Sequence, residues 1–234
     1  MQTRVERNRW LKRFAWVAMA CLGVVAGHAN AQDQVVTSRA CHFDKTAPVI
    51  GPACLLARVS VGALPAEPVY WHLDTFANVA AANAAKDARS VVVQDYGKIW
   101  LFTIAPKQWH AKGATFVALI GPLPLKQAPA FDAEYIHSMF APGTTAPVHK
   151  HSGPEAFYAL DGDTCLEMPD GVHAAKGPGN SLMMPGGEPM LLMATGTNTR
   201  RAFALVLHDS TQPATTRVTE WKPAGLCKAD AAGI

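Results

Sequence analysis

Two histidines one residue apart, followed by a strand break and a glutamate, constrain this chain more than any other feature. They are His149 and His151, and a Ser-Gly-Pro break separates them from Glu155. Alternate side chains of a strand project to the same face, so we expect both imidazoles on one side. A hairpin at the break would fold Glu155 back toward them. Two imidazole nitrogens and one carboxylate oxygen suit Fe(II), Mn(II), Ni(II) or Zn(II).

This segment resembles the first motif of the cupin superfamily, G-x5-H-x-H-x3,4-E-x6-G. Its fixed positions are matched by Gly143, His149, His151, Glu155 and Gly162. The resemblance implies an all-β chain with a cupin-type jelly-roll β-barrel, and a metal bound by the two histidines and the glutamate. It implies no single activity, because the superfamily contains oxygenases, isomerases, seed-storage proteins and sensors. The alternative to a metal site is that the two histidines are simply polar residues on a half-exposed strand. For a lone histidine we would prefer that interpretation.

The second motif of that superfamily, G-x5-P-x-G-x2-H-x3-N, is matched only in its backbone positions. Gly179, Pro185 and Gly187 fit, but Met190 replaces the histidine and Ala194 replaces the asparagine. Without a third histidine we expect the metal to be held more weakly. A thioether is a good ligand for Cu(I), so Met190 is a candidate copper ligand. We favour the alternative that Met190 is flexible apolar filler of the barrel.

The N-terminus has the organisation of a secretory signal peptide. Five basic residues precede an apolar run over 14–27, and small residues stand before Gln32. We therefore predict that residues 1–31 are a signal peptide cleaved after Ala31, and that the protein is periplasmic or secreted. An uncleaved anchor is disfavoured because a spanning helix needs about 20 apolar residues. A lipoprotein through Cys21 is also disfavoured, since the usual leucine three positions before it is missing.

The net charge of the mature chain excludes one class of partner. Five of the 21 basic residues and one of the 18 acidic residues fall in the signal peptide, which leaves 16 basic and 17 acidic residues. The net charge of −1 gives no indication of nucleic-acid binding. We expect a small-molecule partner, no nucleic acid, no membrane after cleavage, and a homodimer as a further option, because edge strands of such barrels commonly pair.

Four cysteines remain in the mature chain, an even number suited to an oxidising compartment. Three pairings can be written. We prefer Cys41–Cys54, which would close a loop in the N-terminal region, together with Cys165–Cys227, which would tie the C-terminal tail to the barrel. A metal site built on cysteines is disfavoured, because the chain contains no C-x-x-C spacing.

The rest of the chain divides by pattern into an extension over 32–125, a cupin barrel over 126–212 and a tail over 213–234. In the extension we expect one helix over 76–87, capped by Asp74 or Thr75. A double barrel is disfavoured because no H-x-H pair follows Gly113. Apolar, β-branched and aromatic runs between glycine and proline turns predict these strands: 55–61, 69–73, 90–94, 99–104, 115–120, 134–140, 145–151, 155–161, 163–168, 181–184, 189–194 and 202–208.

Further site residues are suggested by their positions on these strands. Phe157 shares a face with Glu155, so we expect it to line the barrel. Phe157, Met190 and Arg201 are candidates for binding a substrate, the arginine through a carboxylate. Glu155 is the candidate general base if the protein is catalytic. His208 is the best replacement for the missing histidine.

The sequence leaves two function classes open. One is a non-catalytic module that binds a divalent metal ion, a small molecule or both inside the barrel. The other is a metal-dependent cupin enzyme, an oxygenase or isomerase acting on a small metabolite. A metal-free barrel with a degenerate site is a further alternative.

Overall fold

The computed structural model of the protein describes residues 36–37 and 54–229. The chain divides into two units, Met1–Gln32 and Asp33–Ile234, and only the second contains described residues. The predicted signal peptide, its cleavage site and Cys41 therefore lie outside the described residues. Within the described ranges, no helix has the length and apolar character needed to cross a membrane.

The described residues form fifteen strands and one short helix, which confirms the all-β prediction. The elements are β1 (Val36–Thr37), β2 (Cys54–Gly62), β3 (Val69–Phe76), α1 (Val79–Ala85), β4 (Ser90–Asp95), β5 (Lys98–Pro106), β6 (Thr115–Ile120), β7 (Phe131–Phe140), β8 (His149–His151), β9 (Glu155–Asp161), β10 (Asp163–Met168), β11 (Gly171–Ala175), β12 (Ser181–Met184), β13 (Leu191–Thr195), β14 (Arg200–Asp209) and β15 (Thr215–Arg217).

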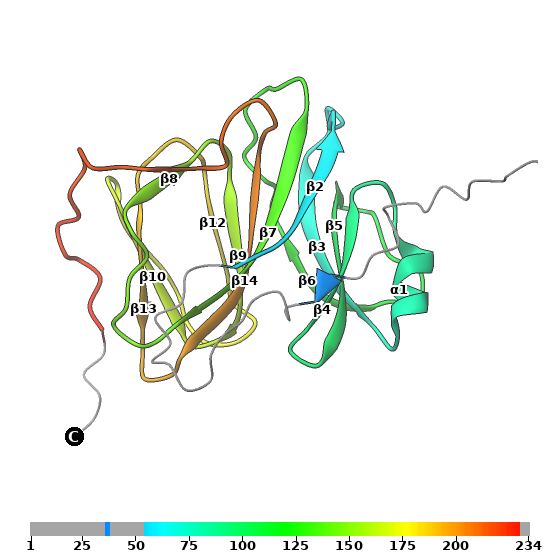
Figure 1. The fold of residues 1–234 in the computed structure, drawn as a ribbon, viewed down its shortest axis with the longest axis horizontal. Coiled ribbons are helices and arrows are strands. Elements are labelled where there is room, and N and C mark those ends of the chain that lie inside the picture. The colour runs from blue at the N-terminus through cyan, green and yellow to red at the C-terminus, as the bar shows by residue number, and fades with distance from the viewer. Residues whose placement is uncertain (1–35, 38–53, 230–234) are drawn as a thin grey trace, which may run out of the picture. The chain divides into compact units, whose positions relative to one another are not determined.

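Two sheets face each other and form the barrel. One has the strand order β12-β9-β14-β7-β2, and the other has the order β11-β10-β13 (Figure 1). Isolated bridges pair Thr145 with Met193 and His149 with Met190, so the segment before β8 continues the smaller sheet. Inside the barrel, an apolar core includes Phe140, Phe157, Leu166, Met190 and Leu192. The motif-bearing strands thus border an apolar interior.

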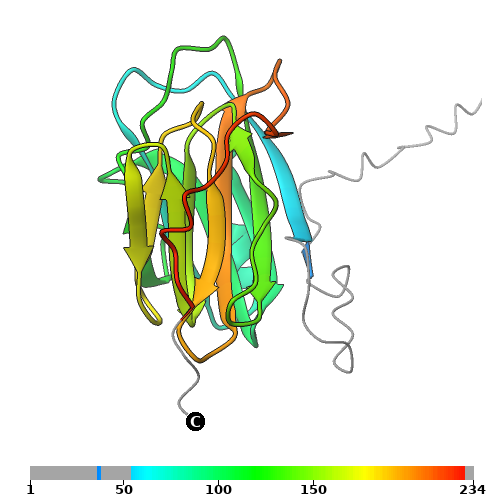
Figure 2. The same cartoon turned by 90° about the vertical axis from the view of Figure 1, so that its left-hand side faces the viewer.

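A third sheet, ordered β1-β4-β5-β3-β6, covers the outer face of the larger barrel sheet (Figures 1 and 2). The contact is aromatic: the ring of Phe102 lies 5.3 Å from that of Tyr135 on β7 and 5.0 Å from that of Phe203 on β14. Each such buried side chain contributes roughly 1.5–3 kcal/mol of hydrophobic stabilisation. Because of this cover, β7 and β14 have buried residues on both faces.

Two segments take part in the barrel although they lie outside the range 126–212. Strand β2 pairs antiparallel with β7 and forms an edge of the larger sheet. Strand β15, in the segment expected to be a tail, pairs with β8. Both pairings join segments far apart in sequence, so local patterns do not reveal them.

Two local predictions are wrong in their bounds, and one edge strand of the barrel was missed. The helix begins at Val79 with Asn78 as its cap, because β3 continues through Phe76 and occupies the residues expected to start the helix. The strand expected over 145–151 is regular only over His149–His151. Strand β11 was not predicted, since Gly171–Ala175 has little apolar character; it pairs with β10 as an edge. The other expected strands are confirmed, with ends shifted by a few residues.

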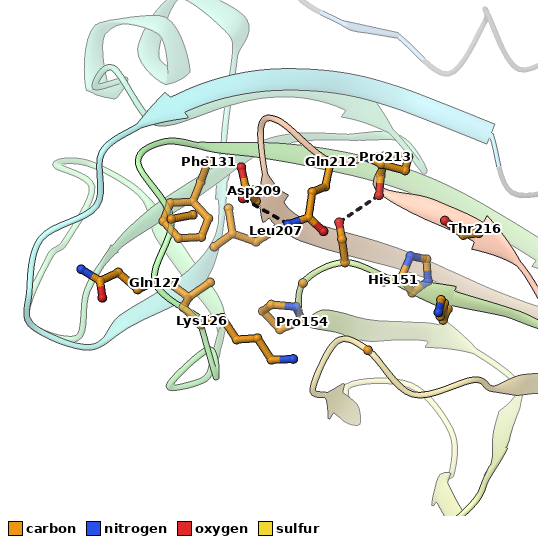
Figure 3. A pocket seen from close by; sticks show the side chains of 16 residues that line it. Lys126, Gln127, Phe131, His151, Pro154, Leu207, Asp209, Gln212, Pro213 and Thr216 are labelled. Carbon is orange, nitrogen blue, oxygen red and sulfur yellow. Dashed lines mark hydrogen bonds between the residues drawn. The ribbon is translucent and has the colours of Figure 1, made fainter.

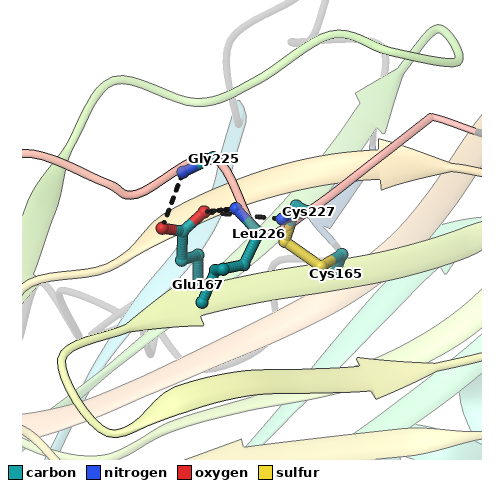
Figure 4. The surroundings of a disulfide bond; sticks show 5 residues. All are labelled: Cys165, Glu167, Gly225, Leu226 and Cys227. Carbon is teal, nitrogen blue, oxygen red and sulfur yellow. Dashed lines mark hydrogen bonds between the residues drawn. A yellow bond between two sulfur atoms is a disulfide. The ribbon is translucent and has the colours of Figure 1, made fainter.

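The C-terminal segment is fixed to β10 by a covalent bond and by a carboxylate (Figure 4). The Cys165–Cys227 disulfide is present as predicted, with 5.8 Å between the Cα atoms. Glu167, only 1% exposed, accepts hydrogen bonds from the backbone N–H groups of Gly225 and Leu226, at 3.0 and 2.8 Å, and from that of Cys227. Cys54 is also disulfide-bonded, and its expected partner Cys41 lies outside the described residues.

This clamp predicts a pH-dependent stability. Burial favours the neutral form of Glu167, but the backbone hydrogen bonds outweigh it and lower its pKa below the ordinary 4.5. A lowered pKa in the folded state stabilises the fold above pH 4.5, and this stabilisation is lost as pH falls through the folded-state pKa. Glu167→Gln should therefore lower the melting temperature at pH 7 and flatten its acid dependence. Thermal unfolding between pH 7 and pH 3 measures this. Equal acid profiles for Glu167→Gln and the exposed control Glu188→Gln would contradict the clamp.

Candidate metal centre

The turn between β8 and β9 brings the histidines and the glutamate together. Gly153 in this turn packs directly on β14, where a Cβ on the glycine would lie 2.9 Å from the Cα of His208 and closer still to the carbonyl of Leu207. The backbone of Gly186 contacts Gly153 from the other side. Only glycine fits such a contact, and this close approach places Glu155 at the start of β9 beside the end of β8.

His149, His151 and Glu155 each present one donor atom, and the three atoms lie within 4.8 Å of one another. Nε2 of His151 lies 3.3 Å from Oε2 of Glu155. Both side chains are buried, and neither of these two atoms has a hydrogen-bond partner besides the other. The structure therefore brings together the three ligands predicted from the sequence.

The other nitrogen of each imidazole is occupied. Nδ1 of His149 donates to the carbonyl of Pro147 at 2.6 Å, and Nδ1 of His151 donates to the carbonyl of Ala214 at 3.0 Å. With the proton on Nδ1, the lone pair of Nε2 is free to bind a metal, which is the tautomer that metal-ligating histidines adopt. The donor set therefore fits a divalent transition-metal ion.

Electrostatics act differently on the two histidines. Burial, together with the neighbouring His151, lowers the pKa of His149, so its imidazole is neutral at pH 7. Burial also disfavours charge on His151, but the carboxylate of Glu155 outweighs burial and raises its pKa. A divalent cation would compete with that proton for the same two atoms, so we expect metal binding to strengthen as pH rises.

A cavity of about 490 Å³ opens beside these ligands, within the size range of small-molecule sites. Glu155 and both histidines lie at its wall. The polar residues around it include Ser138, Thr215 and Arg217. Apolar side chains form most of the remaining wall: Ile136, Phe140, Ala146, Phe157, Leu192 and Ala204. Phe157 thus lies where its alternation with Glu155 placed it.

A smaller cavity of about 310 Å³ lies on another side of His151 (Figure 3). Its wall includes Lys126, Phe131 and Asp209. The carboxylate of Asp209 is already engaged by Thr211 and Gln212, at 2.8 Å from the hydroxyl of the threonine. This cavity therefore offers no free carboxylate next to His151.

Met190 and His208 do not join the three ligands in the described structure. Met190 is 1% exposed and packs in the barrel core with Phe140 and Phe157, while its backbone pairs with that of His149. This placement is that of an apolar filler, and thioether ligation remains a prediction. His208 is buried near the C-terminal end of β14, next to Gly153, and its Nδ1 contacts the carbonyl of Asp209 at 2.9 Å.

Arg201, the candidate for binding a carboxylate, does not point into the barrel. Arg201 is exposed, whereas Arg200 is completely buried and lies over the ring of Phe157 at 5.1 Å. On β14, Arg200 shares a face with Ala204, which lines the cavity, and Arg201 faces the opposite side. The sequence pattern does not show which of the two arginines points into the barrel, because residues on both faces of β14 are buried.

Several residues at the site were missed. Ser138 lines the cavity and could have been found from its two-residue spacing to Phe140. Ala214, the residue before β15, contacts His151 through its carbonyl at 3.0 Å. Thr215, the first residue of β15, contacts the same ring through its hydroxyl at 3.1 Å. No local pattern indicates this pairing, because β15 has three exposed residues and no apolar alternation.

Comparisons with known proteins give structural matches only. No family model matches the chain, and no curated protein matches it. Among solved structures, a cupin-like protein from Thermotoga maritima has 14% identity and a TM-score of 0.34, covering 38% of this chain and 68% of its own. An RmlC-like cupin family protein from Methanocaldococcus jannaschii has 20% identity and a TM-score of 0.29, covering 31% and 67%. A structure of DMSP lyases has 13% identity and a TM-score of 0.32, covering 37% and 44%.

The close packing of Gly153 predicts that a single methyl group added at this position strongly destabilises the protein. Gly153→Ala should lower the free energy of unfolding by about 3 kcal/mol, since the added Cβ collides with the backbone of β14. Gly113→Ala is the control: it has a φ of +78° and open space around it, so it should cost only about 1 kcal/mol of backbone strain. Urea unfolding of both variants measures the difference. Equal losses would mean that the contact of Gly153 with β14 is not what holds the turn.

Proposed function

We propose that this protein, a barrel with the cupin fold and a His-His-Glu group in its interior, is an exported cupin that binds a divalent transition-metal ion and a small molecule inside the barrel. The metal ligands are His149, His151 and Glu155. Fe, Mn, Ni or Zn suits this nitrogen and oxygen set, and Cu is the alternative if Met190 contributes its sulfur.

One observation carries the metal proposal. Nε2 of His151 and Oε2 of Glu155 are buried and face each other at 3.3 Å, and in the neutral Nδ1–H tautomer neither atom has a hydrogen-bond donor among the described groups. A buried polar atom without a partner costs roughly 1–3 kcal/mol. A cation between them removes this cost, and Nε2 of His149 completes a set of three ligands.

The residues around the ligands prepare them for this role. The carbonyl groups of Pro147 and Ala214 hold the two imidazoles in the Nδ1–H tautomer and orient their rings. When bound, the metal ion would supply a Lewis acid beside the cavity. The apolar wall containing Phe157 would exclude water from a bound molecule and strengthen polar contacts at the ligand end.

An enzyme is the second candidate function. The supporting observation is the cavity of about 490 Å³ directly beside the three ligands, which is large enough for a small metabolite. In that case Glu155 is the candidate general base whenever it is not a ligand. Oxygen uptake by the metal-loaded protein with a panel of small molecules separates an oxygenase from a binding module.

Metal content tests the proposal directly. The purified mature protein should contain one metal ion per chain, and His151→Ala or Glu155→Gln should lose it, with a drop in affinity larger than the roughly 10–100-fold cost of removing an outer-shell partner. His173→Ala is the matched control, since this histidine lies on β11 next to Asp170, away from the three ligands. Elemental analysis and metal titration measure both. A wild-type protein that binds no metal would overturn the proposal.

Export makes a separate prediction. The disulfide between Cys165 and Cys227 is compatible with an oxidising compartment. On expression in a bacterium with a secretion pathway, the mature protein should be recovered from the periplasm with Gln32 at its N-terminus. Intact-mass measurement shows the cleavage site. An intact chain that begins at Met1 and stays in the cytoplasm would contradict export.

A further inference from the structure

Arg200 is a fully buried cation whose partners are neutral. Its Nε donates to Oγ1 of Thr164 at 2.5 Å and its Nη1 donates to Oγ of Ser138 at 2.7 Å. Nη2 has no hydrogen-bond partner, and no ion pair among the described residues includes Arg200. Burial lowers its pKa to about 10, so the guanidinium stays charged at pH 7.

Glu155 is the carboxylate that acts on Arg200 electrostatically, but it forms no ion pair with it, so the buried charge is only partly compensated and what completes its compensation identifies what the site accommodates. The rings of Phe140 and Phe157 lie 5.8 and 5.1 Å from the guanidinium and offset part of the cost through cation–π interactions. Both rings also line the large cavity. The positive charge therefore lies directly behind the cavity wall, where an anion in the cavity would stabilise it.

Ser138 connects Arg200 to the cavity. It lines the cavity, and its Oγ accepts a hydrogen bond from Arg200. Its own proton goes to the carbonyl of Ala202 over a long 3.3 Å contact. Since this contact is weak, the hydroxyl can turn and donate into the cavity instead. A hydroxyl that accepts from a cation is also a stronger donor, as in other polarised hydrogen-bond chains.

The strand register separates this hydroxyl from the metal ligands. Ser138 pairs with Ala202 on β14, whereas Glu155 pairs with Val206, four residues further along the same strand. Four residues of a strand span about 13 Å. The row between them contains Phe157, Ala204 and Ile136, which all line the cavity. The cavity thus has the metal ligands at one end, an apolar middle and a positively polarised hydroxyl at the other end.

We propose that the cavity binds a small organic acid with an apolar body, whose carboxylate accepts a hydrogen bond from Ser138 while Arg200 holds that hydroxyl in place and supplies the compensating charge. This deepens the proposed function, on which it rests for the location of the binding site. The end of the ligand opposite the carboxylate then lies toward His149, His151 and Glu155. Arg200 is a positioning residue here, because its guanidinium acts through Ser138.

The test compares an acid with its neutral isostere in metal-depleted protein. By titration calorimetry, 4-phenylbutyrate should bind the wild type at least tenfold more tightly than 4-phenylbutyramide. Ser138→Ala should reduce the ratio of the two affinities, acid over amide, to about one. Ser138→Thr, which keeps the hydroxyl, should restore the ratio. Arg200→Met should also lose the ratio if it folds. Ser210→Ala, an exposed serine outside the cavity wall, is the matched control and should behave as the wild type.

The outcomes separate this inference from the metal proposal. Equal binding of acid and amide by the wild type, no binding of the acid, or a ratio that Ser138→Ala leaves unchanged would each overturn the carboxylate site. A preference for the acid that appears only with metal and does not depend on Ser138 would mean that the carboxylate binds the metal ion. That result would also overturn the carboxylate site at Ser138. Loss of the ratio in Ser138→Ala, with metal content unchanged, supports it. A wild type that binds no metal but keeps the ratio would overturn only the metal proposal.

Discussion

The contact of Gly153 with β14 is the constraint on which the candidate site depends. The glycine lies against the backbone of Leu207 and His208, and Gly186 closes on it from the other side. This packing turns the chain tightly between β8 and β9, so that Nε2 of His151 and Oε2 of Glu155 meet at 3.3 Å. Strand β15 then pairs with β8 and orients the imidazole of His151 from behind through Ala214. The ligands are thus fixed by backbone contacts, which side-chain substitutions elsewhere in the barrel would not disturb.

The barrel interior holds its buried charges in separate places. Glu155 lies at the end with the histidines, Glu134 is paired with Arg58 at the edge, and Arg200 lies behind the phenylalanine rings with hydroxyl partners only. Burial of such groups costs free energy, and an apolar core would be at least as stable. Their retention is explained if the interior binds charged groups: a cation at the His-His-Glu end and an anion near Ser138. The apolar row between them then selects the body of the bound molecule.

The sequence predicted the fold through its resemblance to the cupin motif, and it predicted the His-His-Glu group because that group depends on short-range spacing. Histidines two residues apart on a strand share a face wherever the strand lies, and the turn residues between His151 and Glu155 restrict where the glutamate can lie. Predictions that required knowledge of the surroundings were wrong or absent. Both faces of β14 are buried, so alternation did not distinguish Arg200 from Arg201. The contact of Thr215 with His151 joins residues 64 positions apart. Between the paired strands β2 and β7, the chain forms strands β3 to β6 of the third sheet.

X-ray absorption spectroscopy of the metal-loaded protein tests the central claim most directly, because it reports the ligand atoms themselves. The account predicts two imidazole nitrogens and a carboxylate oxygen in the coordination shell, with no sulfur, since Met190 packs in the apolar core. A spectrum dominated by a sulfur ligand, or one without imidazole scattering, would contradict a metal site built from His149, His151 and Glu155.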